Sequence, residues 1–147
     1  MKILIISPGK AHDHIVEDGI IEYQKRLSKR LPVEWVLPKI GTKESEGIAI
    51  LKLINEEDVV ILFDERGDNL STEDFAVLLD REMQEGSKRL VFIVGGAFGV
   101  DGNVKARADH TYKLSSLIFP HMLVRLILIE QLYRAVSIID GGKYHHV

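Results

Sequence analysis

Short runs of consecutive apolar residues alternate along this chain with longer segments whose apolar residues are spaced three and four apart. The runs predict strands covered on both faces, and the wider spacing predicts amphipathic helices. We expect strands at residues 2–6, 33–37, 59–63, 90–94 and 111–114, and helices at 13–29, 44–54, 71–85, 101–108 and 120–139. Because strands and helices alternate, the pattern predicts an α/β fold with a parallel sheet flanked by helices on both faces.

The last predicted helix is apolar on almost every side. Pro120 suits its first turn, and the Gly141-Gly142 pair is expected to end it. Such a helix is buried on most sides, which is difficult in a small monomer. Its polar residues come in pairs four apart, His121 with Arg125 and Glu130 with Arg134. We therefore expect this helix to carry both a subunit interface and a functional site.

Composition narrows the class of protein. A length of 147 residues with 46% apolar and 28% charged residues predicts one domain with its own core. The absence of cysteine excludes disulfides, thiol nucleophiles and cysteine-ligated metals. Three charged residues interrupt the 120–139 helix, and the apolar run at the N-terminus is too short for a signal peptide. We expect a cytoplasmic protein without a membrane anchor.

Charge is distributed unevenly. After residue 103 there are six lysines and arginines against three acids, whereas the first 103 residues carry 13 basic and 19 acidic side chains. Four of the six histidines also lie in the basic segment. Such asymmetry can indicate an anionic partner at one end of the molecule, but on charge alone we favour chance in a short window as the explanation.

Three polar or glycine-rich loops follow predicted strands. They are the charged segment 64–68, the segment GGAFG at 95–99 and the segment 114–119. In a parallel sheet all three share the carboxyl edge, where α/β proteins bind ligands, so together they predict a pocket. Taken alone, GGAFG indicates a tight turn, and the adjacent acids Asp64 and Glu65 indicate a solvated turn.

The C-terminal tail contains Tyr144, His145 and His146. Adjacent histidines on an extended segment point in opposite directions, and no zinc-binding spacing accompanies them, so we expect no metal site. A polar aromatic tail fits stacking and hydrogen bonding to a nucleic-acid base better. A disordered terminus is the competing interpretation.

The segments GGAFG, SSLIFPHMLVRLILIEQLYRA and YHH together resemble the bacterial large-subunit rRNA pseudouridine N3-methyltransferases of the SPOUT superfamily. KILIISPGK, IIEYQKRL and DERGDNLS extend the resemblance over nearly the whole chain. The resemblance implies a single SPOUT domain over residues 1–147, with a deep C-terminal trefoil knot. It also implies a homodimer that uses S-adenosylmethionine, but no metal, to methylate N3 of a pseudouridine in 23S rRNA on assembled ribosomes.

By position, the resemblance also implies site residues. The cofactor is expected to contact Phe63, Gly95, Leu114, Ser115, Ser116, Leu117, Ile118 and Phe119. Arg125, Tyr144 and His145 match the residues that handle the substrate. We expect Arg125 to stabilise the anion developing on the ring, with His145 as a candidate proton acceptor.

The chain departs from the family pattern in a few places. Phe63 stands where leucine is usual, Asp68 replaces a common lysine, and the chain ends in Val147, which leaves the role of His146 open. The segment between the second strand and the second helix is also shorter than usual. A ribosome-associated factor that binds a nucleotide or S-adenosylmethionine without catalysis is the alternative function.

Overall fold

The computed structural model describes residues 1–96 and 98–146, and its strands form one parallel sheet. The strands are β1 (Lys2–Ile6), β2 (Val33–Val36), β3 (Val59–Asn69), β4 (Arg89–Val94) and β5 (His110–Lys113). The helices are α1 (His14–Leu27), α2 (Lys43–Lys52), α3 (Thr72–Gln84), α4 (Gly102–Arg107) and α5 (His121–Ile139). The strand order is β2-β1-β4-β3-β5, and the predicted α/β class is confirmed.

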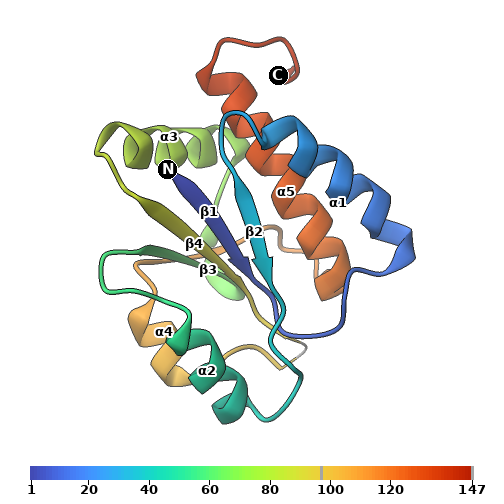
Figure 1. Cartoon of the computed structure of the whole chain (residues 1–147), viewed down its shortest axis with the longest axis vertical. Helices are drawn as coiled ribbons and strands as arrows, with labels where there is room; N and C mark the ends of the chain where they lie inside the picture. The colour runs from blue at the N-terminus through green and yellow to red at the C-terminus, as the bar shows by residue number, and fades with distance from the viewer. Residues whose placement is uncertain (97, 147) are drawn as a thin grey trace.

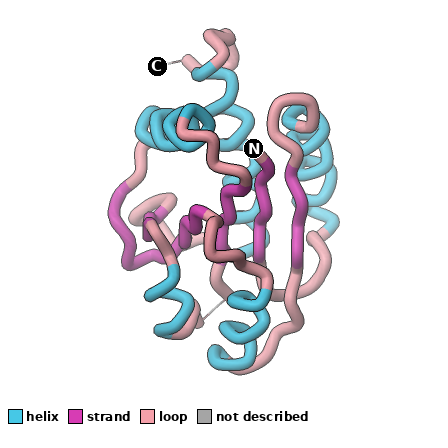
Figure 2. The backbone as a smooth tube through the Cα atoms, turned by 60° about the vertical axis from the view of Figure 1, so that its left-hand side comes forward, coloured by secondary structure: helices cyan, strands magenta, loops and turns pink. Residues whose placement is uncertain are grey.

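Helices cover both faces of the sheet, so the molecule has three layers (Figure 1 and Figure 2). One core joins the sheet to α1, α3 and α5, and includes Phe92, Leu128 and Leu132. A second, smaller core on the opposite face joins the sheet to α2 and α4 through Ile50 and Val104. Central strands are therefore buried on both faces, which explains why they are uninterrupted apolar runs.

β3 is longer than the sequence predicts. Residues 64–68, expected as a charged loop, continue the strand, and Asp68 and Asn69 pair with β5 after a register shift. Gly67 permits this pairing, because a Cβ there would lie 2.7 Å from the backbone carbon of Tyr112. The charged segment forms a strand whose paired residues lie 44 residues later in the chain, so local pattern could not predict it.

Several helix predictions also need correction. Pro120 precedes α5 as its N-cap, with an extended ψ of 145°, instead of standing in the first turn. Two apolar residues of the predicted amphipathic helices, Ile15 in α1 and Ile48 in α2, are 81% and 57% exposed instead of buried. α5 is less enclosed than predicted: Arg125 and four apolar residues are buried, while Leu123 is exposed.

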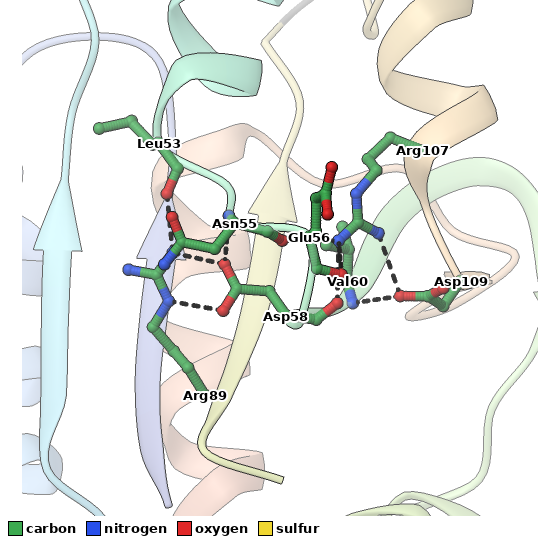
Figure 3. Close-up of polar contacts among 8 residues, drawn as sticks. All are labelled: Leu53, Asn55, Glu56, Asp58, Val60, Arg89, Arg107 and Asp109. Carbon is green, nitrogen blue, oxygen red and sulfur yellow. Dashed lines mark hydrogen bonds and ion pairs between the residues drawn. The ribbon is translucent and has the colours of Figure 1, made fainter.

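A network of ion pairs and hydrogen bonds fastens the amino edge of the sheet (Figure 3). Arg89, at the start of β4, donates to the carboxylate of Asp58 and to the carbonyl oxygen of Leu53. Arg107, at the end of α4, donates to the carbonyl oxygen of Asp58 and to the carboxylate of Asp109. This network joins three chain segments at the edge opposite the predicted pocket.

Candidate active site

A cavity of about 710 Å³ opens at the carboxyl edge of the sheet. Its walls come from the end of β3, the loop after β4 and the loop between β5 and α5, the three segments that the sequence predicts to converge. A second, smaller cavity of about 490 Å³ lies at the amino edge, and none of the predicted site residues lines it. The predicted location of the pocket is therefore supported by its geometry.

Most of the residues expected to hold a cofactor line the larger cavity. They are Phe63, Gly95, Leu114, Ser115, Leu117, Ile118 and Phe119. Ser116 is the exception: it is exposed and does not line the cavity, and its Oγ lies 3.5 Å from the Nζ of Lys113. The backbone N–H of Leu117 donates to Ser115 Oγ at 2.9 Å, which bends the loop around the cavity.

The loop after β4 is both a tight turn and a wall of the cavity. Gly96 and Gly99 form an isolated antiparallel bridge, with Gly99 donating to the carbonyl oxygen of Gly96 at 3.0 Å. Gly99 has φ of +80°, a conformation that is strained for residues with a Cβ. Ala97 lies outside the described residues, and Phe98 extends into solvent with 83% of its surface exposed. The two interpretations of GGAFG are thus compatible.

Charged groups of both signs surround the mouth of the cavity. Arg66 pairs with Asp64 at 3.4 Å, and the Asp64 carboxylate is only 6% exposed, so the solvated-turn prediction is wrong for this residue. Glu65 and Lys113 also line the cavity.

The cavity fits S-adenosylmethionine. Aromatic and aliphatic walls from Phe63, Leu114 and Phe119 suit an adenine ring, and loops 95–99 and 114–119 present backbone donors and acceptors. The cofactor carries an ammonium, a sulfonium and a carboxylate, which the acidic and basic groups at the mouth can balance. The size of the cavity lies within the usual range of roughly 300–1,000 Å³ for small-molecule sites.

Arg125 is completely buried behind this cavity. Its Nε donates to Ser7 Oγ at 2.8 Å, and its terminal nitrogens donate to the carbonyl oxygens of Ser7 and Lys10 at 3.3 and 2.9 Å. A further contact of 3.3 Å joins it to His12 Nδ1. Arg125 therefore fastens α5 to the loop between β1 and α1, and burial lowers the pKa of its guanidinium.

His121, one turn before Arg125, lines the cavity. Its Nε2 would lie 3.5 Å from a Cβ built on Gly9, so the imidazole packs against the loop that Arg125 holds. Burial, followed by the positive charge of Arg125, lowers the pKa of His121, and only Asp13 opposes this effect. The imidazole is therefore neutral at pH 7.

Tyr144 and His145 are brought together, but near the other end of α5. The Tyr144 hydroxyl donates to Glu130 at 3.1 Å and lies 3.2 Å from the Tyr23 hydroxyl. Burial and these two hydrogen bonds raise the pKa of Tyr144. His145 Nδ1 lies 3.2 Å from the guanidinium of Arg134, so Nδ1 accepts this bond. His145 Nε2 then donates to Glu73, at 3.0 Å.

The tail and the cavity are separated within one chain (Figure 1). His121 lines the cavity, whereas the tail contacts Glu130 and Arg134 farther along α5. The 13 residues from His121 to Arg134 span about 20 Å of helix axis. The structure therefore does not unite the expected cofactor residues with Tyr144 and His145.

Some residues near the site could not have been identified from the sequence pattern. Glu73, in the first turn of α3, contacts His145 across 72 residues, and Ser7 contacts Arg125 across 118. His121 is different, because its spacing from Arg125 places both on one side of the helix. Its position at the start of the helix that borders the cavity could have identified it as a site residue.

Two findings concern membranes and metals. Within residues 1–96 and 98–146, no helix is long and apolar enough to cross a bilayer. In the same described residues, no group of three histidine, aspartate or glutamate side chains is placed to hold a metal ion.

Known proteins resemble this chain over its full length. Residues 1–145 match the family described as "Predicted SPOUT methyltransferase". The chain is 38% identical, over 156 residues and 99% of both sequences, to a protein of Parabacteroides distasonis named "Ribosomal RNA large subunit methyltransferase H". Proteins of the same name from Bacillus cereus and Acetivibrio thermocellus are 39% and 35% identical, with the same coverage.

Proposed function

This chain belongs to the SPOUT methyltransferase family, and from that premise we propose that it methylates N3 of a pseudouridine in 23S rRNA with S-adenosylmethionine as donor. The substrate is the assembled ribosome. The observation that carries the proposal is the cavity bordered by Phe63, Gly95 and the 114–119 loop, because these are the positions expected to hold the donor.

S-adenosylmethionine supplies an electrophilic methyl group when bound. Leu114 and Phe119 would hold its adenine by apolar contact, and the backbone of Gly95 and the 114–119 loop would orient it. The apolar side chains of the cavity limit the access of water to the transferred group, and no metal takes part.

Arg125 supports this site without contacting the substrate. It retains the substrate-handling role expected from the sequence, but through the 7–12 loop instead of by direct contact, because four of its contacts go to Ser7, Lys10 and His12. A guanidinium has five N–H donors, so few remain for a substrate. Arg125 is thus a positioning residue.

Tyr144 and His145 belong to the site of a second copy of the chain. The cavity of the same chain lies about 20 Å away, toward the start of α5, so an active site formed from one chain would lack them. A homodimer in which the tail of each chain approaches the cavity of the other brings the two parts together. The exposed apolar side chains of Leu117, Ile118 and Leu123, near the cavity, suit burial in such an interface.

Residues 1–147 form one SPOUT domain in this proposal, and its C-terminal part is a deep trefoil knot. Two features support this. The family match spans residues 1–145, and the segment before α5 lies against the loop after β4 at the shared cavity. True knots are rare, so the family membership carries most of the argument.

The basic C-terminal segments of both chains bind the RNA. The chain has a net charge of −3, yet residues after 103 are basic, and pairing two chains doubles that local charge. Binding to ribosomes should therefore weaken as salt rises. An enzyme that acts on ribosomes works in the cytoplasm.

Transfer of a tritiated methyl group from S-adenosylmethionine to ribosomes lacking the modification tests the proposal. Label in 23S rRNA from intact ribosomes, and little label on deproteinised rRNA, is the expected result. Bound cofactor without any label would favour the alternative function, a ribosome-associated factor that binds S-adenosylmethionine without catalysis. If neither label nor cofactor binding is found, the proposal is wrong.

A further inference from the structure

His121 has the features of a catalytic group that the proposed mechanism has not yet used. It lines the donor cavity from the first residue of α5, and its side chain is half-buried. In the described residues 1–96 and 98–146, the structure records no hydrogen bond to either of its ring nitrogens. A cavity-facing imidazole that keeps its hydrogen-bonding capacity is available to a substrate.

His145, the other candidate proton acceptor, is in a different state. Arg134 occupies its Nδ1 and Glu73 its Nε2, so both ring nitrogens are engaged. It also lies on a tail, whereas His121 begins a 19-residue helix fastened by the buried Arg125. Of the two histidines, His121 is the one that is both rigid and free to accept a proton.

The surroundings of His121 keep it in the accepting form. Arg125 follows it on α5, Asp13 acts on it from the segment after β1, and His12 of that segment contacts Arg125. Lys113, Arg66, Asp64 and Glu65 line the same cavity. Burial and Arg125 disfavour the imidazolium, so the ring has a lone pair at neutral pH.

We propose that His121 is the catalytic residue that accepts the N3 proton of the target pseudouridine during methyl transfer, an inference that rests on the proposed function. The N3–C bond forms while the S–C bond breaks, and the N3 proton passes to the imidazole. The sulfonium charge is thereby neutralised, and an imidazolium is formed. Arg125 then repels this imidazolium, so the proton leaves to water and the neutral ring is restored.

Gly9 and Arg125 set the orientation of this imidazole. Gly9 has φ of +134° and packs against the ring without a side chain between them. A Cβ at this position would lie 3.3 Å from the Arg125 guanidinium and 3.5 Å from His121 Nε2. The loop therefore leaves the imidazole little space to turn away from the cavity.

The test compares His121→Gln with His14→Gln, which changes an exposed histidine at the start of α1. Glutamine preserves polarity and approximate size but cannot take up a proton near neutral pH. His121→Gln should lower kcat by about 100-fold or more, leave the affinity for S-adenosylmethionine within about twofold, and remove the acidic limb of the kcat profile. His14→Gln should behave like the wild type.

A second readout does not depend on turnover. In NMR spectra of the wild-type protein, the His121 imidazole should titrate below the ordinary value and shift when S-adenosylhomocysteine is added. Unchanged kcat and pH profile in His121→Gln would overturn the inference while leaving the methyltransferase function intact. A wild-type protein that transfers no methyl group would instead overturn the proposed function itself.

Discussion

The Nε of Arg125 donates a hydrogen bond of 2.8 Å to Ser7 Oγ, across 118 residues of sequence. The two residues connect the start of α5 with the end of β1, next to the donor cavity. Because Arg125 is buried and satisfies several backbone and side-chain acceptors, the loop before α1 depends on it.

Replacing Arg125 by alanine should therefore destabilise the protein by about 3 kcal/mol, because Ser7 and Lys10 lose their donors and a void is left. Urea unfolding measures the change. Arg125→Lys should recover only part of the stability, since one ammonium cannot span all these acceptors. KM for ribosomes should rise in the lysine variant while the affinity for the cofactor is unchanged.

The exposed Arg26→Ala is the control, with little expected effect on stability. Equal behaviour of the two alanine variants would refute the role of Arg125.

Gly99 and Gly86 form a matched pair of left-handed glycines, with φ of +80° and +78°. Alanine at either position should cost about 1 kcal/mol of stability, because both conformations are strained for a residue with a Cβ. Only Gly99 lines the donor cavity, so only Gly99→Ala should weaken binding of S-adenosylmethionine in calorimetry. If Gly86→Ala weakened binding equally, general destabilisation would be the explanation.

The proposed two-chain site predicts complementation between inactive variants. Gly95→Val should block the cavity of its own chain, and His145→Ala should remove the tail contribution to the partner chain. Each variant alone should transfer little methyl. After mixed refolding, heterodimers should hold one intact site, and activity should return to about a quarter of the wild-type value. Two variants of the cavity, mixed in the same way, provide the control and should stay inactive.

Acid sensitivity should depend on the network at the amino edge of the sheet (Figure 3). Burial alone would raise the pKa of Asp58, but its hydrogen bonds with Arg89 and with the backbone of Asn55 outweigh burial and lower it. A lowered folded-state pKa means that the stabilisation is present above the ordinary value near 3.8 and is lost as pH falls below it. Asp58→Asn should therefore be less stable at pH 7 and show a shallower loss of stability in acid.

Urea unfolding at several pH values between about 6 and 2.5 measures this slope. The exposed Asp18→Asn is the matched control and should keep the wild-type slope. An unaltered slope in Asp58→Asn would show that the ion pair with Arg89 contributes nothing to acid stability.

The two half-buried histidines near Arg125 predict a second pH effect. The pKa values of His12 and His121 are lowered, for both residues mainly by burial and then by Arg125. Their contribution to the free energy of unfolding is full above about pH 6.5. It decreases as the pH falls from there towards the lowered pKa values of the folded state, because the unfolded chain then binds more protons. In the double variant His12→Gln/His121→Gln, the free energy of unfolding should fall less between about pH 7 and 5 than in the wild type. A wild-type protein equally stable at both values would contradict this.

Local sequence pattern predicted the elements well where local physics decides them. Apolar runs such as β4 are strands because both faces of the sheet are covered. Ser71 accepts from the N–H of Asp74 and is the N-cap of α3, a position that favours serine, and the predicted helix at 71–85 is found there. The three loops meet at one cavity, because parallel strands end at the same edge.

Long-range pairing was not predictable from the sequence. The extension of β3 depends on a partner strand and on the missing Cβ of Gly67, and nothing within residues 64–68 encodes that partner. The site shows the same limit. Position along α5 reveals that His121 and Arg125 share a side, but the contacts of Arg125 with Ser7 and of His145 with Glu73 exist only in the folded chain.

Nucleoside analysis of 23S rRNA after reaction with the purified protein tests the central claim most directly. Ribosomes lacking the modification are incubated with labelled S-adenosylmethionine, and the rRNA is digested and separated by liquid chromatography with mass spectrometry. The account predicts a single labelled nucleoside, N3-methylpseudouridine, reaching at most one per ribosome. Label in any other nucleoside, or none although the cofactor binds, would contradict it.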